Sequence, residues 1–363
     1  MPAISTISDV TTKFDHTSDD VIRLRRWGNN NDMEMLPRAD NTRRIELVVG
    51  TSRACHLRVS DKHVSGEHAR LVFDERGWTI QDLKSKNGLW LDNQRCEWGP
   101  LRPGTEIGLG RKFILIAESP RSIALRTFLT RILGWGSDRA KAIDLALRSI
   151  LAPSAQRSAI AVCSPSDPLA IAHSIHRVVY GARPFVRCDP KGKPTEESVR
   201  WPRNFTKASD ALAAAAGGTL CVWAGRLPRD YNEIWSALVE PTATTRLVIC
   251  SNKPINGKEF LTVPIVVPPL STRPDELPHI IREYAKDAVA ELDGQPHHAR
   301  PEDLDWIQQN EASSLAKIEA ATLRCIALRI APNLNQAAKL LGMARESLAG
   351  WIKSRKMPMH VEG

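Results

Sequence analysis

The segment from Gln336 to Lys356 separates apolar from charged side chains in the way that contact with DNA requires. Its first half is predicted to be a short helix with an apolar face formed by Ala337, Ala338, Leu340 and Leu341. Gly342 then permits a sharp turn, and Met343 faces the core. A second helix is predicted from Arg345 to Lys356, with inward positions at Leu348, Trp351 and Ile352. The outward positions of the second helix are Arg345, Glu346, Ser347, Lys353, Arg355 and Lys356. The pattern predicts a helix-turn-helix whose partner is double-stranded DNA.

Residues 315 to 357, approximately, resemble the C-terminal DNA-binding domain of Fis-type regulators, which has the same paired alanines, Leu-Gly turn and basic second helix. The resemblance implies a homodimer in which base edges are contacted by Ala344, Arg345, Glu346 and Ser347, and phosphates by Lys353, Arg355 and Lys356. Two positions depart from the family. Ala344 replaces the usual capping hydroxyl, and Gly350 costs about 1 kcal/mol relative to alanine inside a helix. The alternative is a helical hairpin that packs on its neighbour and carries solvated charge.

Composition and charge restrict the class of protein without choosing its partner. The 363 residues include 50 Lys and Arg against 41 Asp and Glu, and the net charge of +9 suits either a polyanion partner or an ordinary soluble protein. No apolar run reaches the length of about 18 residues that spans a bilayer, and the N-terminus lacks the parts of a signal peptide. We therefore expect a cytoplasmic protein without membrane contact. The seven cysteines are scattered, so neither disulfides nor a metal site are expected.

Residues 41 to 118 alternate apolar and polar positions in short runs, whereas residues 1 to 40 are polar and show no sustained period. The runs include IELVV, ARLVF, WTIQDL and FILIAE, and turn signals such as Lys-Asn-Gly and Pro-Gly separate them. Several short strands at this spacing predict an all-β sandwich with its loops gathered at one end. The first 40 residues are predicted to be a flexible leader.

The loop residues of the predicted sandwich resemble those of the forkhead-associated (FHA) domain, which binds phosphothreonine. The resemblance rests on four stretches in the family's order: Gly50, Ser65-Gly66-Glu67-His68-Ala69, Ser85-Lys86-Asn87-Gly88 and Leu101 to Gly110. It implies that Ser65 binds the phosphate and that Asn87 holds the ligand backbone. Lys86 stands where the family often has a hydroxyl residue. The resemblance also implies that His68 braces the loops through hydrogen bonds.

One position departs from the FHA pattern, because Thr51 follows Gly50 where the family has an arginine. A phosphothreonine carries nearly two negative charges, and a charge-assisted contact to it is worth about 1.5 to 3 kcal/mol. Its loss weakens binding by about tenfold or more. Arg53, Lys62 and Lys86 are the cations on the same rim that could replace it. The alternative is a sandwich that only packs or dimerises.

Residues 119 to 152 show helical periodicity and are predicted to form a helical linker. Residues 153 to 290 alternate strands and helices, which predicts a parallel α/β sheet. This middle region resembles the AAA+ ATPase domain of bacterial sigma-54 enhancer-binding proteins. The stretches that carry the resemblance are Ala172 to His176, Arg183 to Val186, Ala216 to Leu220 and Val267 to Pro278.

The residues that such an ATPase needs are missing. The loop from Cys163 to Leu169 has prolines in the places of a glycine and of the lysine that contact phosphate, and Asp167 would repel an anion. Trp223 and Ala224 occupy the positions of the family's Asp-Glu pair. The loop that contacts the sigma factor and the arginine-finger segment are absent too. We therefore expect a degenerate AAA+-like domain that binds no nucleotide cofactor and is not an enzyme. An unrelated activity at Cys163, Ser164 or Asp167 is the alternative.

These predictions combine into a transcription regulator in which residues 291 to 363 form the C-terminal helical domain. Its sandwich would recognise phosphothreonine on a partner protein or on the leader of the chain itself, at Thr6, Thr11, Thr12 or Thr17. Its helix-turn-helix would bind DNA, without activating sigma-54 polymerase in the classical way. The alternative from another class is a phospho-signalling adaptor or scaffold that does not bind DNA.

Overall fold

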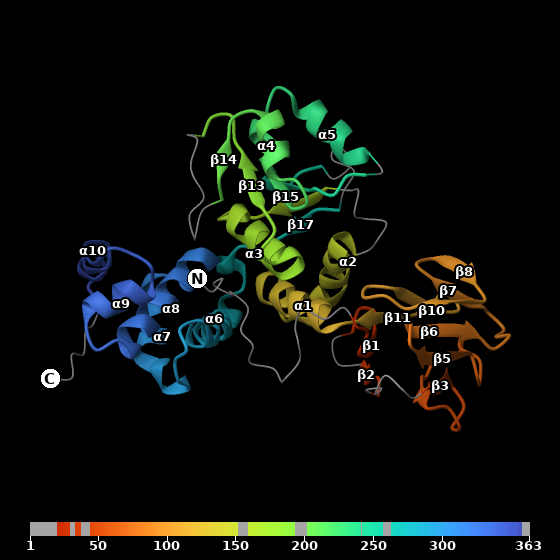
Figure 1. Ribbon diagram of the computed structural model, residues 1–363. Helices are drawn as coiled ribbons and strands as arrows, with labels where there is room; N and C mark the ends of the chain where they lie inside the picture. The colour runs from red at the N-terminus through yellow and green to blue at the C-terminus, as the bar shows by residue number, and fades with distance from the viewer. Residues whose placement is uncertain are drawn as a thin grey trace. The chain divides into compact units, whose positions relative to one another are not determined.

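The computed structural model describes residues 20–29, 33–37, 44–151, 159–192, 202–240, 242–256 and 263–357. The chain divides into two units, one formed mainly by Phe14–Ile160 and the other mainly by the residues from Ala161 onward. The first unit holds a β-sandwich and two helices, and the second holds an α/β sheet and a set of helices (Figure 1). Among the described residues, no helix is long and apolar enough to cross a membrane.

The all-β sandwich expected from the alternating runs is confirmed. Its two sheets have the strand orders β2-β1-β11-β10-β7-β8 and β4-β3-β5-β6-β9. Inward residues of both sheets, such as Leu71, Ile80 and Ile107, form one buried core. The strands are β1 (Arg23–Arg26), β2 (Met33–Met35), β3 (Ile45–Gly50), β4 (Leu57–Arg58), β5 (Ala69–Asp74), β6 (Gly77–Asp82), β7 (Leu89–Leu91), β8 (Gln94–Cys96), β9 (Trp98–Pro100), β10 (Glu106–Leu109) and β11 (Phe113–Glu118).

The sandwich begins before residue 41, because part of the predicted leader is folded into strands. β1 pairs antiparallel with β11 on one side and with β2 on the other. Arg25 of β1 is fully buried, and its guanidinium donates hydrogen bonds to the carboxylates of Glu118 and Asp144. Burying the charge of Arg25, in a strand of sequence RLRR, would otherwise cost free energy, and these bonds compensate that cost. The threonines at 6, 11, 12 and 17 lie outside the described residues.

The segment predicted as a helical linker forms two helices that belong to the sandwich unit. They are α1 (Pro120–Leu133) and α2 (Ala140–Leu151). Ser119 caps α1, because its side chain accepts a hydrogen bond from the Ser122 amide while the Ser122 hydroxyl accepts one from the Ser119 amide. Asp144 of α2 is the carboxylate that Arg25 binds from β1. These helices are thus attached to the sandwich through a buried ion pair.

The central region is the parallel sheet predicted from its alternating strands and helices. The strand order is β14-β13-β15-β16-β12-β17, and the registers given by β12 with β17, β13 with β15 and β15 with β16 are all parallel. The strands are β12 (Ile160–Cys163), β13 (Phe185–Cys188), β14 (Asn204–Phe205), β15 (Thr219–Trp223), β16 (Arg246–Ser251) and β17 (Ile265–Val266). The helices between them are α3 (Pro168–Tyr180), α4 (Ala208–Ala214) and α5 (Tyr231–Val239).

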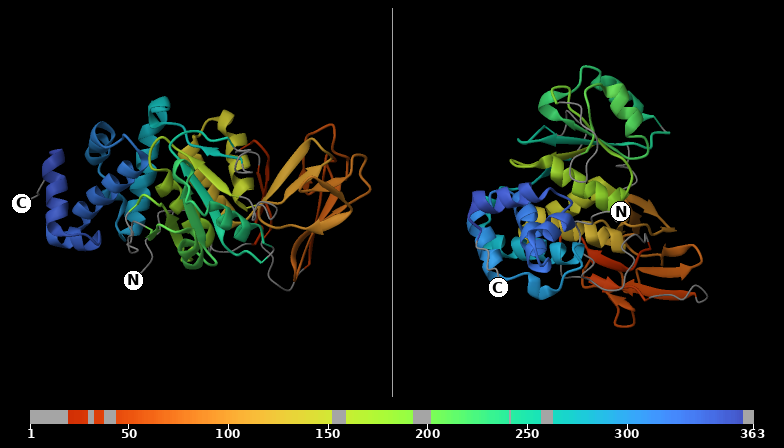
Figure 2. Two further views of the ribbon diagram at one scale, coloured as in Figure 1. Left: turned by 90° about the horizontal axis from the view of Figure 1, so that it is seen from above. Right: turned by 60° about the vertical axis from the view of Figure 1, so that its left-hand side comes forward.

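The C-terminal region is a set of helices that begins at Leu277, earlier than the predicted boundary of 291. The first of them packs against the second and third, so it belongs with them (Figure 2). The helices are α6 (Leu277–Glu291), α7 (Pro301–Asn310), α8 (Leu315–Ile330), α9 (Leu334–Leu340) and α10 (Arg345–Arg355). Residues 341 to 344 join α9 to α10, and Gly342 has a φ of 59°, which favours glycine. The two predicted helices and their glycine turn are therefore present.

Short 3-10 helices complete the described structure. They are η1 (Ser137–Arg139), η3 (Ala224–Arg226), η4 (Leu270–Thr272), η5 (Pro274–Glu276) and η6 (Pro296–His298).

Candidate functional site

Three loops at one end of the sandwich are joined to one another by hydrogen bonds. The amides of Thr51 and Ser52 donate to the carbonyls of Ser65 and Gly66, at 3.0 and 2.9 Å. A side chain at Gly50 could not fit here, since a Cβ would lie 2.1 Å from the Gly66 carbonyl oxygen. The strand end at Gly50 and the loop at Ser65 are thus in backbone contact.

The structure brings together Ser65, Lys86 and Asn87, which the sequence places in two separate loops. The Ser65 hydroxyl oxygen accepts a hydrogen bond of 3.0 Å from the Lys86 amide. Its O–H remains available to donate to an incoming anion. The Asn87 side chain is exposed and donates to the His63 carbonyl at 2.8 Å, which fixes its orientation while leaving its amide oxygen free as an acceptor.

His68 holds two of these loops together, as the sequence predicted. Its ring is fully buried, and Nδ1 accepts a hydrogen bond of 3.1 Å from the Ser65 amide. Nε2 must then carry the proton, and it lies 3.2 Å from the Gly88 carbonyl, to which it donates. Burial lowers the pKa of His68, which favours the neutral ring that this arrangement requires.

The rim of the loops carries exposed cations, although none follows Gly50 directly. Thr51 uses its amide to reach Ser65 and brings no charge. The side chains of Arg53, Lys62 and Lys86 are exposed and make no hydrogen bond or ion pair with the described part of the chain. Together with the Ser65 hydroxyl they can attract and hold an anion of about two charges.

Sequence reasoning missed Trp90, which bonds Asn87, and Arg111, which contacts Trp90. The indole nitrogen of Trp90 donates a hydrogen bond of 3.2 Å to the Asn87 carbonyl. The guanidinium of Arg111 lies 4.4 Å from the centre of the Trp90 ring, a cation–π contact. The signal that could have found Trp90 is its position three residues after Asn87, in the strand that follows the Asn87 loop.

The arrangement of these loops agrees with a sequence comparison. Residues 47–110 match the family model of the FHA domain. The match includes Gly50, Ser65, Lys86 and Asn87 and ends at Gly110, one residue before Arg111. No curated protein sequence matches the chain.

Solved structures similar to the chain include FHA domains, and in the three that follow the similarity covers about a quarter of the chain. One, from a study of phosphothreonine-dependent FHA domain interactions, is 22% identical, with 27% of this chain and 94% of that one covered and a TM-score of 0.24. The FHA domain of the CT664 protein of Chlamydia trachomatis is 19% identical, with 27% and 95% covered and a TM-score of 0.24. EmbR of Mycobacterium tuberculosis, solved with a low-affinity phosphopeptide, is 20% identical, with 29% and 26% covered and a TM-score of 0.24.

In the loop after β12, the amide and the hydroxyl of Ser164 are both engaged in hydrogen bonds. The amide of Ser164 donates to the Ser251 carbonyl at 3.0 Å, and its hydroxyl donates to the Ser166 carbonyl. Asp167 has a φ of 53° and precedes α3 without capping it. Burial raises the pKa of the Cys163 thiol, which opposes its ionisation to a nucleophile. Among the described residues, no group of His, Cys, Asp and Glu could hold a metal ion.

The first turn of α10 presents the side chains that were predicted to contact base edges. Ala344, Arg345, Glu346 and Ser347 are all exposed, as are Lys353 and Lys356. The amide of Ser347 bonds the backbone of Ala344, whose side chain provides no cap, as its type predicted. Nothing lies within 4 Å of a Cβ built at Gly350, so this face of the helix is open.

Two residues of this region lie differently from the prediction. Arg355 was expected to face phosphates, but it is half-buried, pairs with the buried Glu311 and stacks on Trp351. Trp351 in turn meets Trp306 edge to face, with ring centres 5.7 Å apart. Leu340, expected on the inward face of α9, is 43% exposed. Arg355 therefore fastens the end of α10 to the rest of the helical domain.

Proposed function

We propose that the FHA domain of this chain binds phosphothreonine peptides through Ser65, Lys86 and Asn87. The observation that carries the proposal is the hydrogen bond from the Lys86 amide to the Ser65 hydroxyl, because it joins Ser65 to the loop of Asn87 and leaves the O–H available to donate. A phosphate bound at Ser65 and a peptide backbone bound at Asn87 would then come from one extended ligand. The match of residues 47–110 to the FHA family supports the same assignment.

The charge that the family's arginine would supply comes in this proposal from the exposed rim. Of the rim cations, Lys86 is the one bonded directly to Ser65, because its own backbone amide donates the hydrogen bond to the Ser65 hydroxyl. Arg53 lies in the loop whose backbone is bonded to Ser65 and Gly66. Either side chain can rotate toward a phosphate at the cost of its rotamer entropy.

The proposal is tested with an oriented library of phosphothreonine peptides presented to the full chain. We expect selection of a subset that depends on the phosphate, and loss of that selection for Ser65→Ala. A library treated with phosphatase serves as the control. Equal capture before and after phosphatase treatment would show that the domain does not recognise the phosphate.

A second activity, DNA binding by α10, is favoured by the exposure of its first turn. Arg345, Glu346 and Ser347 would face base edges, and Lys353 and Lys356 would contact phosphates. Arg355 is left out of that set, because it is engaged with Glu311. The combined protein would be a phosphothreonine-dependent transcription regulator that acts as a homodimer and contacts its DNA through two copies of α10.

DNA binding is tested by selecting fragments from a sheared genomic pool with the full chain and with Arg345→Ala. We expect a shared, near-palindromic site that Arg345→Ala no longer enriches, and a uniform loss of affinity across sequences for Lys353→Ala. Binding should weaken steeply with salt. If no fragment is enriched, the adaptor function replaces the DNA-binding one, with the FHA domain and the central sheet as its recruiting surfaces.

The central sheet is proposed as a scaffold that has lost nucleotide hydrolysis. What supports this is the closed loop after β12, where the amide and hydroxyl of Ser164 are both occupied. A phosphate loop needs free amides that converge on the anion. The partner of the FHA domain can be another protein or the leader of the chain itself, and a phosphorylated leader peptide competes in the library experiment only in the second case.

A further inference from the structure

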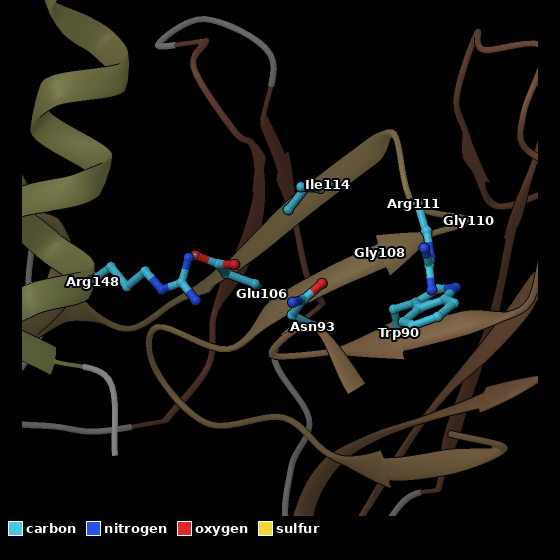
Figure 3. Close-up of a pocket in the computed structure, with 8 residues that line it drawn as sticks. All are labelled: Trp90, Asn93, Glu106, Gly108, Gly110, Arg111, Ile114 and Arg148. Atoms are coloured by element: carbon cyan, nitrogen blue, oxygen red, sulfur yellow. Dashed lines mark ion pairs between the residues drawn. The ribbon is translucent and has the colours of Figure 1, made fainter. Parts of the chain in front are cut away.

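A cavity of about 250 Å³ lies on the outer face of the FHA sheet (Figure 3). Gly108 of β10 forms part of its lining and stands directly between Trp90 of β7 and Ile114 of β11 in the strand register. A Cβ on Gly108 would lie 3.0 Å from the Cβ of Trp90 and 2.8 Å from the Gly110 carbonyl. No side chain at position 108 therefore fills the cavity, whose volume falls below the range of about 300 to 1,000 Å³ for small-molecule sites. It suits one long side chain of a bound peptide.

The cavity, called the groove from here on, is continuous with the proposed peptide site at Asn87. Gly110 lines the groove, and a Cβ at Gly110 would lie 3.0 Å from the Cβ of Asn87. Trp90 lines the groove as well, and its indole nitrogen donates to the Asn87 carbonyl. A peptide whose backbone is held by Asn87 therefore passes directly to the groove.

The far end of the groove contains a carboxylate that lacks a hydrogen-bond donor. Glu106 is only 9% exposed, and its Oε1 is buried without a hydrogen bond from any described residue. Arg148 of α2 lies 3.4 Å from that oxygen, near enough for an ion pair but not in hydrogen-bonding geometry. Figure 3 shows Glu106 and Arg148 at one end and Trp90 with Arg111 at the other. A buried acceptor in this state destabilises the protein until a donor reaches it.

The charges around Glu106 favour a cation as that donor. Burial and the nearby carboxylates of Asp92 and Asp144 raise the pKa of Glu106, and Arg148 acts in the opposite direction. Asp144 is already bound by Arg25, so Arg148 is the cation left to serve Glu106. A second guanidinium or ammonium group would supply the missing hydrogen bond, whereas an acidic side chain would be repelled.

We propose that this groove selects phosphothreonine peptides that carry an arginine or lysine, whose charged end hydrogen-bonds to Glu106. The inference rests on the proposed binding of phosphothreonine at Ser65 and Asn87 and defines the class of partner for that site. The aliphatic part of the basic side chain lies along Trp90 and Ile114. The partner of this chain is therefore a phosphorylated segment with a basic residue at a fixed distance.

The position of the basic residue follows from the strand. Glu106 precedes Gly110 by four residues, which span about 13 Å at the rise of a β-strand. An extended peptide advances about 3.3 Å per residue, and the long basic side chain covers part of the distance. The cation thus belongs about two to four positions from the residue that Asn87 holds.

The experiment uses calorimetric titration of the full chain with phosphothreonine peptides in an alanine and serine background. A single arginine, alanine or glutamate is placed in turn at each position on either side of the phosphothreonine. We expect arginine at one position to bind about tenfold more tightly than alanine there, and glutamate to bind more weakly than alanine. Glu106→Gln should bind the arginine and alanine peptides equally while keeping its dependence on phosphate. Arg148→Ala removes the cation of the chain that competes for Glu106, so it should increase the ratio of the affinity for the arginine peptide to that for the alanine peptide.

Matched controls separate this inference from the proposed function. Glu75→Gln, an exposed carboxylate in the turn between β5 and β6, should keep the arginine preference unchanged. If no phosphopeptide binds, the proposed function fails. If phosphopeptides bind but arginine has no preferred position, or if Glu106→Gln keeps the preference, the groove inference is overturned and the proposed function stands. If Glu106→Gln does not fold, the test rests on Arg148→Ala. A smaller ratio of arginine-peptide to alanine-peptide affinity in that variant would also overturn the inference.

Discussion

The loops of the FHA domain and the loop after β12 are both strand ends where a phosphate could bind, and they use their polar groups in opposite ways. At the FHA loops, the Ser65 hydroxyl accepts one internal hydrogen bond and keeps its own proton for a ligand. After β12, the Ser164 hydroxyl donates its proton to a neighbouring carbonyl, and the Ser164 amide is bonded to Ser251. Both loops contain serine, so serine alone does not identify a phosphate site. The comparison teaches that such a site is recognised by hydrogen-bond donors that the protein itself leaves unused.

Charge separates the two loops in the same direction. The FHA rim carries Arg53, Lys62 and Lys86 with exposed side chains, whereas the loop after β12 ends at Asp167. An anion at the second loop would meet the Asp167 carboxylate, and the Ser164 amide there is already bonded. We therefore expect substitutions in the FHA loops to have larger effects on ligand binding than a substitution in the loop after β12.

Gly50→Val should have the largest effect, because its Cβ would lie 2.1 Å from the backbone oxygen of Gly66 and no rotamer relieves the collision. We expect a loss of about 3 kcal/mol in the stability of the sandwich, together with loss of peptide binding. Thermal unfolding measures the first and titration the second. Gly66→Ala is the control, since its Cβ approaches nothing closer than 4.0 Å. Equal stability of the two variants would contradict the close contact of the loops.

Ser65→Ala should lower affinity for a phosphothreonine peptide by about 10- to 100-fold, because a hydrogen bond to a charged phosphate is lost. The fold should be retained, since the backbone bonds from Thr51 and Ser52 do not involve the hydroxyl. Ser60→Ala, at an exposed serine five residues before Ser65, serves as control. Unchanged affinity for Ser65→Ala would remove the hydroxyl from the site.

Acidification should weaken both units through buried neutral histidines. Burial lowers the pKa of His68 in the FHA domain and, in the central sheet, lowers the pKa of His176 to about 4. A lowered histidine pKa gives stability that is complete above the unfolded value of about 6.5 and declines as the pH falls below it. Hydrogen exchange at pH 7.5 and 5.5 should show the decline in each unit. His68→Gln should flatten it only in the FHA domain, and a uniform change would contradict this assignment.

Asp167→Gly should have the smallest effect, because glycine tolerates the φ of 53° but increases the freedom of the unfolded chain. We expect stability to change by less than about 1 kcal/mol. Neither the parent nor this variant should gain thermal stability from ATP at about 1 mM, since ligand binding would raise it by mass action. ATP-dependent stabilisation of the variant would show that the charge of Asp167 alone, and not the bonded Ser164 amide, prevents nucleotide binding at this loop.

The sequence was sufficient for the elements whose apolar pattern is local. β12 is apolar throughout, β15 and β16 contain the apolar runs LCVW and LVIC, and α3 repeats apolar residues at helical spacing, so each was predicted. The FHA loops were found because Gly50, Ser65 and Asn87 occur in a known order. β1 was missed because Arg25 reads as polar, and the partner that permits its burial, Asp144, lies 119 residues away.

The same reason explains why Arg355 lies differently from its prediction and why the groove residues were not predicted. Arg355 was placed outward by helical spacing, but Glu311, 44 residues earlier, holds it inward. Glu106, Gly108 and Arg148 form a groove only after β10 and α2 have come together, and no local pattern announces it. Long-range pairing of charges is therefore what the sequence did not supply.

The most direct test of the account is titration of the full chain with one phosphothreonine peptide selected from the library, its unphosphorylated form and its phosphoserine form, at about 0.15 M salt to limit non-specific charge effects. The account predicts binding of the phosphothreonine form at least tenfold tighter than the unphosphorylated one, and loss of the difference in Ser65→Ala. Equal affinities for the phosphorylated and unphosphorylated peptides would contradict phosphothreonine recognition by the FHA domain.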